Sequence, residues 1–335
     1  MSARYQLLLP PDYVDRLTRD IDRAQQRVYI TALIIADDQA TCQLISAIER
    51  ASQRGIEVSI AMDLFFTYIE ADHSGSKWRY LRAQIQHMRT TKRRLERSGA
   101  TVRWLGQFGM LIFARRSHVK WSVVDSTVYS FGGVNLYTEG IGCTDFILRV
   151  KDSELADRLV AEQRRIIHTD SETRGYRSHS FGTPEYRVLI DGGQMFDSVI
   201  YHRSLELARQ ATRIIYVSQY CPTGKLARLL QANPTNELYF NYQLRSPLWN
   251  LTMRVLTSIT KAATMYARQE YLHAKFMIFE LPDGQTVAIT GSHNFDSIGS
   301  ALGTREVALE TTDRHIVEQL HTFLDGHVRG ERSAS

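Results

Sequence analysis

The spacing of apolar positions changes several times along the first half of the chain, and each change marks a new element. A helical spacing over residues 13–26 gives way to a strand-like run over 27–34 and then to a second helical spacing over 43–54. Gly55 suits the end of that helix, and a further strand is predicted over 56–63. The pattern therefore predicts helix, strand, helix and strand in succession.

The second half of the chain repeats this order. A strand is predicted over residues 186–190, followed by a helix over 196–210, a strand over 213–218 and a helix over 225–231. Alternating helices and strands are typical of α/β folds, so we expect a mixed β-sheet flanked by helices in each half. An internal repeat of about half the chain predicts two similar domains.

The segment between the halves has the composition of a domain boundary. Residues 168–185 are rich in Ser, Thr and Gly and poor in aliphatic side chains. We therefore expect an N-terminal domain over 1–170, a linker over 171–185 and a C-terminal domain over 186–330. The length of 335 residues allows two domains of ordinary size.

Composition narrows the class of protein. Apolar residues make up 43% of the chain and charged residues 23%, as in folded globular proteins. No apolar run approaches the ~20 residues of a membrane-spanning helix, and the first residues carry no cleavable export signal. Cys42, Cys143 and Cys221 stand too far apart for a zinc motif or a disulfide framework. We expect a cytoplasmic location, and a peripheral position at the inner face of the membrane stays open.

Charge favours phosphate-bearing partners. The formal net charge is +5, and a helical pattern over residues 77–97 holds many of the basic side chains. They are Lys77, Arg79, Arg82, Arg89, Lys92, Arg93, Arg94 and Arg97. The segment is either a solvated basic face or a face turned toward phosphate or a membrane surface, and both interpretations stay open.

One motif occurs twice, in the same place of each half. Its pattern is His-x-Lys-x4-acid, followed by a short strand-like run, a pair of small residues and an asparagine. The residues are His118, Lys120, Asp125, Gly132, Gly133 and Asn135 in the first copy, and His273, Lys275, Glu280, Gly291, Ser292 and Asn294 in the second. Two copies, 155 residues apart and at equivalent places, indicate a shared chemical function.

Each copy is predicted to open a β-hairpin. Because side chains alternate along a strand, the histidine and lysine of a copy share one face, and an imidazole beside an ammonium group is suited to bind phosphate. The acid follows the histidine by seven positions, an odd spacing that points it to the opposite face. We therefore expect Asp125 and Glu280 to be structural anchors rather than catalytic groups.

The trailing residues predict close contact with a ligand. Small residues let the backbone approach it, and asparagine donates hydrogen bonds to its oxygens, so we predict substrate binding by Gly133, Ser292, Asn135 and Asn294. Two facing half-sites would supply a neutral imidazole for attack, a protonated imidazole for the leaving oxygen and positive groups for the developing charge. No metal-ligand cluster accompanies the motif, so we expect metal-independent catalysis without a cofactor.

The duplicated motif resembles that of the phospholipase D superfamily, and the resemblance covers about residues 13–324. It implies an α/β fold of two similar domains about a pseudo-twofold axis, with one active site at their interface and a phosphohistidine intermediate. The catalytic residues would be His118, Lys120, His273 and Lys275. The resemblance makes His118 the nucleophile and His273 the acid, and no oligomer is needed to complete such a site.

The resemblance also implies a carboxylate, about ten residues beyond each motif asparagine, that holds a catalytic histidine by its other ring nitrogen. The matching acids are Asp145 and Glu306, each at the head of an apolar run. The chain departs from the family twice, since Glu280 replaces the usual Asp and Gly133 lacks the hydroxyl of Ser292. The two half-sites are therefore not equivalent.

Three functions are compatible with this sequence. Phosphatidyl transfer or hydrolysis on phospholipids, as in cardiolipin and phosphatidylserine synthases and phospholipase D, is favoured because two full domains in one chain resemble those enzymes. A phosphodiesterase acting on DNA or RNA is the main alternative, because the motif recognises the phosphodiester and not its substituents. A non-catalytic binding protein is disfavoured, since neither copy has lost a motif residue. The remaining histidines, including His293, are expected to be ordinary surface groups.

Overall fold

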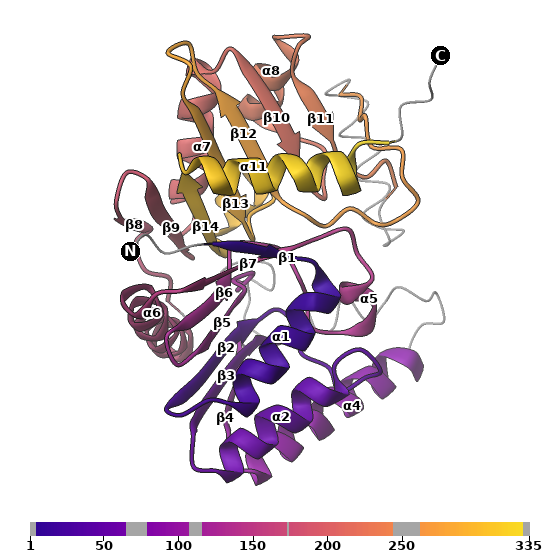
Figure 1. Cartoon of the computed structure of the whole chain (residues 1–335), viewed down its shortest axis with the longest axis vertical. Helices are drawn as coiled ribbons and strands as arrows, with labels where there is room; N and C mark the ends of the chain where they lie inside the picture. Colours follow the sequence, from indigo (N-terminus) through magenta and orange to yellow (C-terminus); the bar gives the residue numbers. More distant parts are fainter. Residues whose placement is uncertain (1–4, 65–78, 107–115, 173, 244–261, 331–335) are drawn as a thin grey trace.

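The computed structural model describes residues 5–64, 79–106, 116–172, 174–243 and 262–330 of the chain. Figure 1 shows the two halves stacked along the long axis of the molecule, each with its own sheet and helices. The predicted α/β class with two similar halves is confirmed.

The first sheet has seven strands in the order β1-β7-β6-β5-β2-β3-β4. The strands are β1 (Gln6–Leu8), β2 (Arg27–Ala32), β3 (Glu57–Asp63), β4 (Thr101–Leu105), β5 (Trp121–Val124), β6 (Thr127–Ser130) and β7 (Ile147–Lys151). The helices of this half are α1 (Pro10–Asp22), α2 (Cys42–Gln53), α4 (Arg79–Arg97), α5 (Thr138–Ile141) and α6 (Ser153–Ser171). β3 runs parallel to β2 and β4, and the other neighbouring strands are antiparallel.

The second sheet also has seven strands, in the order β11-β10-β12-β13-β14-β9-β8. The strands are β8 (His179–Gly182), β9 (Tyr186–Gly192), β10 (Arg213–Val217), β11 (Glu237–Tyr239), β12 (Phe276–Glu280), β13 (Thr286–Gly291) and β14 (Arg305–Thr311). The helices are α7 (Val199–Gln210), α8 (Gly224–Gln231), α10 (Ser297–Leu302) and α11 (Arg314–Phe323), which continues into a π-helical turn, η1 (Leu324–Val328). Only β10 and β11 are parallel in this described sheet.

The two sheets match strand by strand when one order is reversed. Each contains a central hairpin, β5–β6 in the first half and β12–β13 in the second. On one side of the hairpin lies an antiparallel strand, β7 or β14. On the other side lies a strand that has a parallel neighbour, β2 or β10. The first sheet adds β4 at one edge, and the second adds β8 at the other. β8 comes from the segment expected to be a linker, so part of residues 171–185 belongs to the second sheet.

Three cores hold these layers together. One lies between the first sheet and α1 and α2, and another lies between the second sheet and α7 and α8. The third is shared, because α6, α11 and apolar residues from both sheets contribute to it. Figure 1 shows α11 crossing the second half close to β1 of the first, and the Gln319 side chain accepts a hydrogen bond from the Leu7 amide there.

The predicted basic helix is present as α4, although Lys77 lies outside the described residues. Arg94 forms ion pairs with Asp37 and Glu49, each at 2.5 Å. Arg89 and Arg93 are exposed, while Met88 of the same helix is buried in a small apolar cluster. Within the described part of the chain, no helix has the length and apolarity needed to cross a membrane.

The shared core predicts how strongly the halves depend on each other. The ring centroid of Phe323 lies 4.8 Å from that of Phe146 in the first half and 6.2 Å from that of Phe276 in the second. Because Phe323 is only 2% exposed, Phe323→Ala should lower the free energy of unfolding by about 3–5 kcal/mol, measured by urea denaturation. Phe196→Ala is the control, since Phe196 is 72% exposed and should change stability by less than about 0.5 kcal/mol. Equal losses in both variants would contradict a core shared by the halves.

Candidate active site

The predicted hairpins place both motifs at the interface between the halves. His118 and Lys120 lie on the extended segment that enters β5, and His273 and Lys275 occupy the same place before β12. Ser130 on β6 donates a hydrogen bond to the Lys120 carbonyl at 3.1 Å. The hairpin partner strand therefore holds each motif in an extended conformation.

Two short backbone bridges connect each motif to the opposite half. Ser117 pairs with Arg305, and the His118 amide donates to the Arg305 carbonyl at 2.9 Å. Thr144 pairs with Leu272 in the same way, and the His273 amide donates to the Thr144 carbonyl at 2.9 Å. Each histidine is thereby placed beside the residue that precedes the acid of the other half.

These bridges produce two crossed pairs of histidine and carboxylate. The Nδ1 atom of His273 lies 2.7 Å from Oδ2 of Asp145, and Nδ1 of His118 lies 3.1 Å from Oε2 of Glu306. All four side chains are buried. The carboxylates predicted to hold the histidines are therefore in place, and each one comes from the half that does not contain its histidine.

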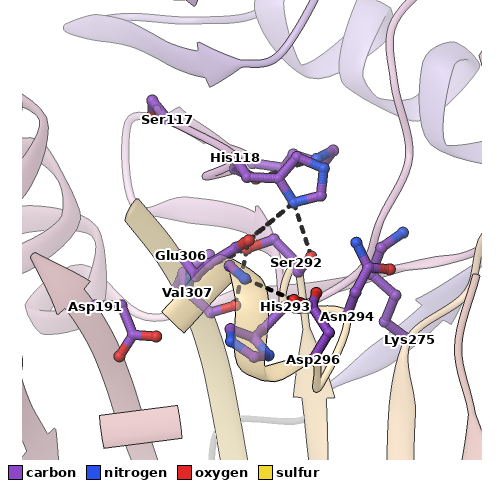
Figure 2. A network of polar contacts seen from close by, with 12 residues as sticks. Ser117, His118, Asp191, Lys275, Ser292, His293, Asn294, Asp296, Glu306 and Val307 are labelled. Carbon is purple, nitrogen blue, oxygen red and sulfur yellow. Dashed lines mark hydrogen bonds and ion pairs between the residues drawn. The ribbon is translucent and has the colours of Figure 1, made fainter. Parts of the chain in front are cut away.

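The ring orientation of His118 follows from its acceptors. Its Nδ1 also lies 3.0 Å from the carbonyl oxygen of Ser292, which can only accept a hydrogen bond. Nδ1 therefore carries a proton, and in the neutral ring the lone pair is on Nε2. Figure 2 shows the His118 ring above Glu306 and Ser292, with Nδ1 turned toward both.

The two lysines occupy equivalent places. Lys120 Nζ donates to the His118 carbonyl at 3.1 Å, and Lys275 Nζ donates to the His273 carbonyl at 2.6 Å. Both side chains are buried. The charges of Lys275 and Lys120 both act on His273 and on Glu306, so each pair is influenced by positive charge from both halves.

The four residues predicted to bind substrate have different surroundings in the structure. A Cβ atom at Gly133 would lie 2.6 Å from Asp145 Oδ2 and 3.0 Å from Lys275 Nζ, so the position has no room for a side chain. The Ser292 hydroxyl instead donates to Glu306 and thereby positions that carboxylate. Asn135 and Asn294 are both buried, and Oδ1 of Asn135 has no hydrogen-bond partner in the described structure. Substrate binding by these residues stays a prediction.

The motif acids lie at the far ends of their strands and bind neighbouring backbone and side chains. Asp125, in the turn of the first hairpin, accepts hydrogen bonds from the amides of Gln25, Gln26 and Arg27 at 2.8–3.1 Å. Glu280 accepts a hydrogen bond from Arg213 at 2.5 Å. These contacts have the form expected of structural anchors.

Burial affects the two pairs differently. Burial by itself raises the pKa of Asp145, but the hydrogen bond from His273 and the charges of His273 and Lys275 outweigh it, so this pKa is lowered and the carboxylate is ionised at neutral pH. Burial raises the pKa of Glu306. Burial and the charge of Lys275 lower the pKa of His273 below 6.5, and Asp145 opposes them. The pairs are therefore alike in geometry, and the pKa values of their carboxyl groups are shifted in opposite directions.

His293 departs from the expectation of a surface group. It is 2% exposed, and its Nδ1 accepts a hydrogen bond from the Phe295 amide at 2.7 Å. Its charge in the protonated form would lower the pKa of Glu306. Its place between Ser292 and Asn294 in the second motif was the signal for burial. Among the described residues, no three His, Cys, Asp or Glu side chains are grouped so as to hold a metal ion.

Comparisons with known proteins give one matching family model, over the first half of the chain. Residues 17–167 match the family model described as "Cardiolipin synthase, PLD-like domain". The resemblance to the phospholipase D superfamily is confirmed. A comparison with curated proteins finds no match.

Solved structures extend the likeness in fold to both halves of the chain. Phosphatidylserine synthase from Haemophilus influenzae Rd KW20 has a TM-score of 0.69 at 14% identity, covering 97% of this chain and 87% of that one. Polyphosphate kinase from Porphyromonas gingivalis has a TM-score of 0.62 at 13% identity and covers 96% of this chain, which spans 50% of that protein. Nuc from Salmonella typhimurium, a phospholipase D family member, covers 53% of this chain at 18% identity with a TM-score of 0.35. At these identities the first two structures show a shared fold.

The charge of Asp145 predicts how His273 titrates in the candidate site. The His273 imidazole should lose its proton below pH 6.5, and Asp145→Asn should lower its pKa further, because the amide no longer supplies the negative charge that favours the imidazolium. NMR of ring-labelled histidine across pH measures both values. Glu280→Gln, at the remote end of β12, should leave the titration unchanged. A midpoint above 6.5 in the unaltered protein, or an equal midpoint in Asp145→Asn, would contradict this account.

Proposed function

We propose that the protein transfers or hydrolyses phosphodiesters through a phosphohistidine intermediate, with phospholipids as the substrate class. The observation that carries the proposal is the crossed arrangement of His118 with Glu306 and His273 with Asp145. Each buried imidazole is held through Nδ1, and Nε2 is the atom that we propose to react. The Lys120 and Lys275 ammonium groups add positive charge beside them.

The reaction divides into two displacements. The neutral Nε2 of His118 attacks phosphorus, a P–N bond forms, and the P–O bond to the leaving group breaks as His273 gives its Nε2 proton to that oxygen. His273 is then neutral and takes a proton from water or an alcohol, whose oxygen attacks phosphorus. The P–N bond breaks, and both histidines return to their starting forms.

The roles of the two histidines follow the family resemblance. In the free protein, burial and Lys275 favour the neutral form of His273, whereas the acid role needs the protonated form. A bound phosphodiester anion would favour the imidazolium, because an opposite charge raises the pKa of histidine. The ionised carboxylate of Asp145 acts in the same direction. We therefore assign attack to His118 and proton donation to His273.

Charge stabilisation is proposed to come from the protein rather than from a metal ion. Lys120 and Lys275 are buried next to the histidines, where low polarity strengthens their interaction with developing negative charge. The Nδ2 amide groups of Asn135 and Asn294 would donate hydrogen bonds to the remaining phosphate oxygens. This set needs no cofactor.

The choice of lipid rests on the names of similar proteins. The matched family model is that of a cardiolipin synthase domain, and the fold extends over nearly all of a phosphatidylserine synthase. A cytoplasmic protein that meets the inner membrane face peripherally would suit this substrate, and the net charge of +5 would favour anionic lipid. A nuclease activity on DNA or RNA is the alternative that the first experiment separates.

Parallel assays test the substrate class and the metal requirement. The purified protein should exchange head groups in anionic phospholipid vesicles supplied with glycerol, and turnover should persist in excess chelator because the lysines supply the positive charge. Single-stranded DNA, in the same buffer, should stay intact. Cleavage of DNA without turnover of lipid would reverse the substrate assignment. Loss of lipid turnover in chelator, restored by a divalent ion, would overturn the metal-free mechanism.

Trapping the intermediate tests the assignment of the histidines. With the ordinary substrate, His118→Ala and His273→Ala should each lose nearly all turnover, because the two groups act as one unit. A substrate with a good leaving group no longer needs the acid, so His273→Ala should accumulate phosphorylated protein, and His118→Ala should not. Peptide mapping locates the phosphoryl group. Phosphorylation of His273 in the His118 variant would reverse the assignment, and half activity in each variant would show two independent sites.

A further inference from the structure

Four charged side chains that the proposed reaction does not use lie behind His118. They are Asp63 at the end of β3, Arg116 two residues before His118, Asp170 in α6 and Arg305 at the start of β14. All four are at most 7% exposed. Two acids and two bases from both halves therefore form a buried ion network at the interface.

Specific contacts connect the members of the network. Arg305 Nη1 donates to Asp170 Oδ1 at 2.8 Å, and Arg305 Nη2 donates to the Arg174 carbonyl at 2.9 Å. The Gly106 amide donates to the other oxygen of Asp170 at 2.9 Å. Arg116 Nη1 lies 3.9 Å from Asp63 Oδ1 and also donates to the Gly106 carbonyl. The side chain of Arg305 thereby fastens the start of β14 to the first half.

The network reaches the candidate site through backbone hydrogen bonds. The Arg305 carbonyl accepts from the His118 amide, and the Arg305 amide donates to the Arg116 carbonyl at 2.7 Å. Asp63 Oδ2 accepts from the Ser117 amide at 2.9 Å. Arg305 directly precedes Glu306, so both members of the His118–Glu306 pair are attached to charged residues of the network. Figure 2 shows the His118 ring turned toward Glu306, with Ser117 farther from that carboxylate.

The backbone before His273 is paired in the same way, but the paired residues are uncharged. Thr144 occupies the place of Arg305, and Tyr271 and Leu272 occupy the places of Arg116 and Ser117. The Thr144 amide donates to the Tyr271 carbonyl at 2.9 Å, as the Arg305 amide does to that of Arg116. Uncharged residues are therefore sufficient to form the bridge itself, and among the residues that the structure describes the ion network is found beside His118 and not beside His273.

Energetics argue against stability as the reason for this addition. Burying ions costs several kcal/mol each, and well-packed apolar residues at such places are often as stabilising as the ion pair. What an ion network adds is directional contact at fixed distances. Such contact matters most where a reacting group must be held within a fraction of an ångström.

We propose that Arg305 is a positioning residue that, through Asp170, holds Glu306 and His118 in the arrangement needed for nucleophilic attack. This inference rests on the proposed function only in giving His118 the nucleophilic role. Arg305 itself touches no substrate and acts through the backbone of His118 and through Glu306.

Arg305→Met and Arg203→Met form a matched pair of variants. Arg203 binds Glu310 at 2.8 Å, and Glu310 is a buried carboxylate five residues beyond Arg305 on the same strand. Arg305→Met should lower kcat by about 100-fold with KM within about twofold, because an ångström-scale displacement of a reacting group has this effect. Arg203→Met should lower the melting temperature and leave kcat within about twofold. Arg305→Lys, which keeps the charge, should restore part of kcat.

A second readout does not depend on activity. In NMR spectra of ring-labelled histidine, Arg305→Lys should shift the His118 ring signals and leave those of His273 in place. If Arg305→Met does not fold, Asp170→Asn replaces it in both measurements. The positioning role would be overturned if kcat were unchanged in the Arg305 variants. It would also be overturned if kcat fell in both Arg305→Met and Arg203→Met in proportion to the stability that each variant loses. A selective His118 shift in a protein that turns over no phosphodiester would support the positioning role and refute the proposed function.

Discussion

Two backbone bridges between the halves determine the geometry of the site. Ser117 pairs with Arg305, and Leu272 pairs with Thr144, so each motif histidine lies next to the residue before the acid of the other half. Because backbone hydrogen bonds fix the partners along the chain, each acid side chain is directed at the opposite histidine. Neither half contains a complete pair of histidine and carboxylate. The chemistry of the molecule therefore depends on association of its halves, which the shared core stabilises.

Because both histidine–carboxyl pairs are buried, their hydrogen bonds matter for stability, and the pKa values of their carboxyl groups differ. A charged group removed from water is strongly destabilising unless another group compensates it. Asp145 receives hydrogen bonds from His273 and from the Gly133 and Phe146 amides, which keep it ionised. Glu306 is held by a serine hydroxyl, and burial raises its pKa. A duplicated fold thus supplies two histidine–carboxyl pairs in which the pKa values of the two carboxyl groups are shifted in opposite directions.

Much of the fold could be predicted because its elements are local. The hairpins at β5–β6 and β12–β13 follow from alternating side chains and turn residues, and most predicted helices begin and end within a few residues of the observed ones. The site was predicted less completely. Gly133 was treated as a lost hydroxyl, whereas neighbouring atoms leave no space for one. His293 was expected at the surface, because a single histidine in a loop has no periodicity that reports its burial.

The sequence by itself determined the candidate site residues, their placement at the heads of two hairpins and the presence of an acid downstream of each. These features extend over a few tens of residues, where strand alternation and turn chemistry act directly. Only the tertiary structure decided which acid serves which histidine. The partners are 128 and 188 positions apart, and over such separations the spacing in the sequence does not predict which side chains meet. The packing of the two sheets around a shared core brings each acid to the histidine of the other half.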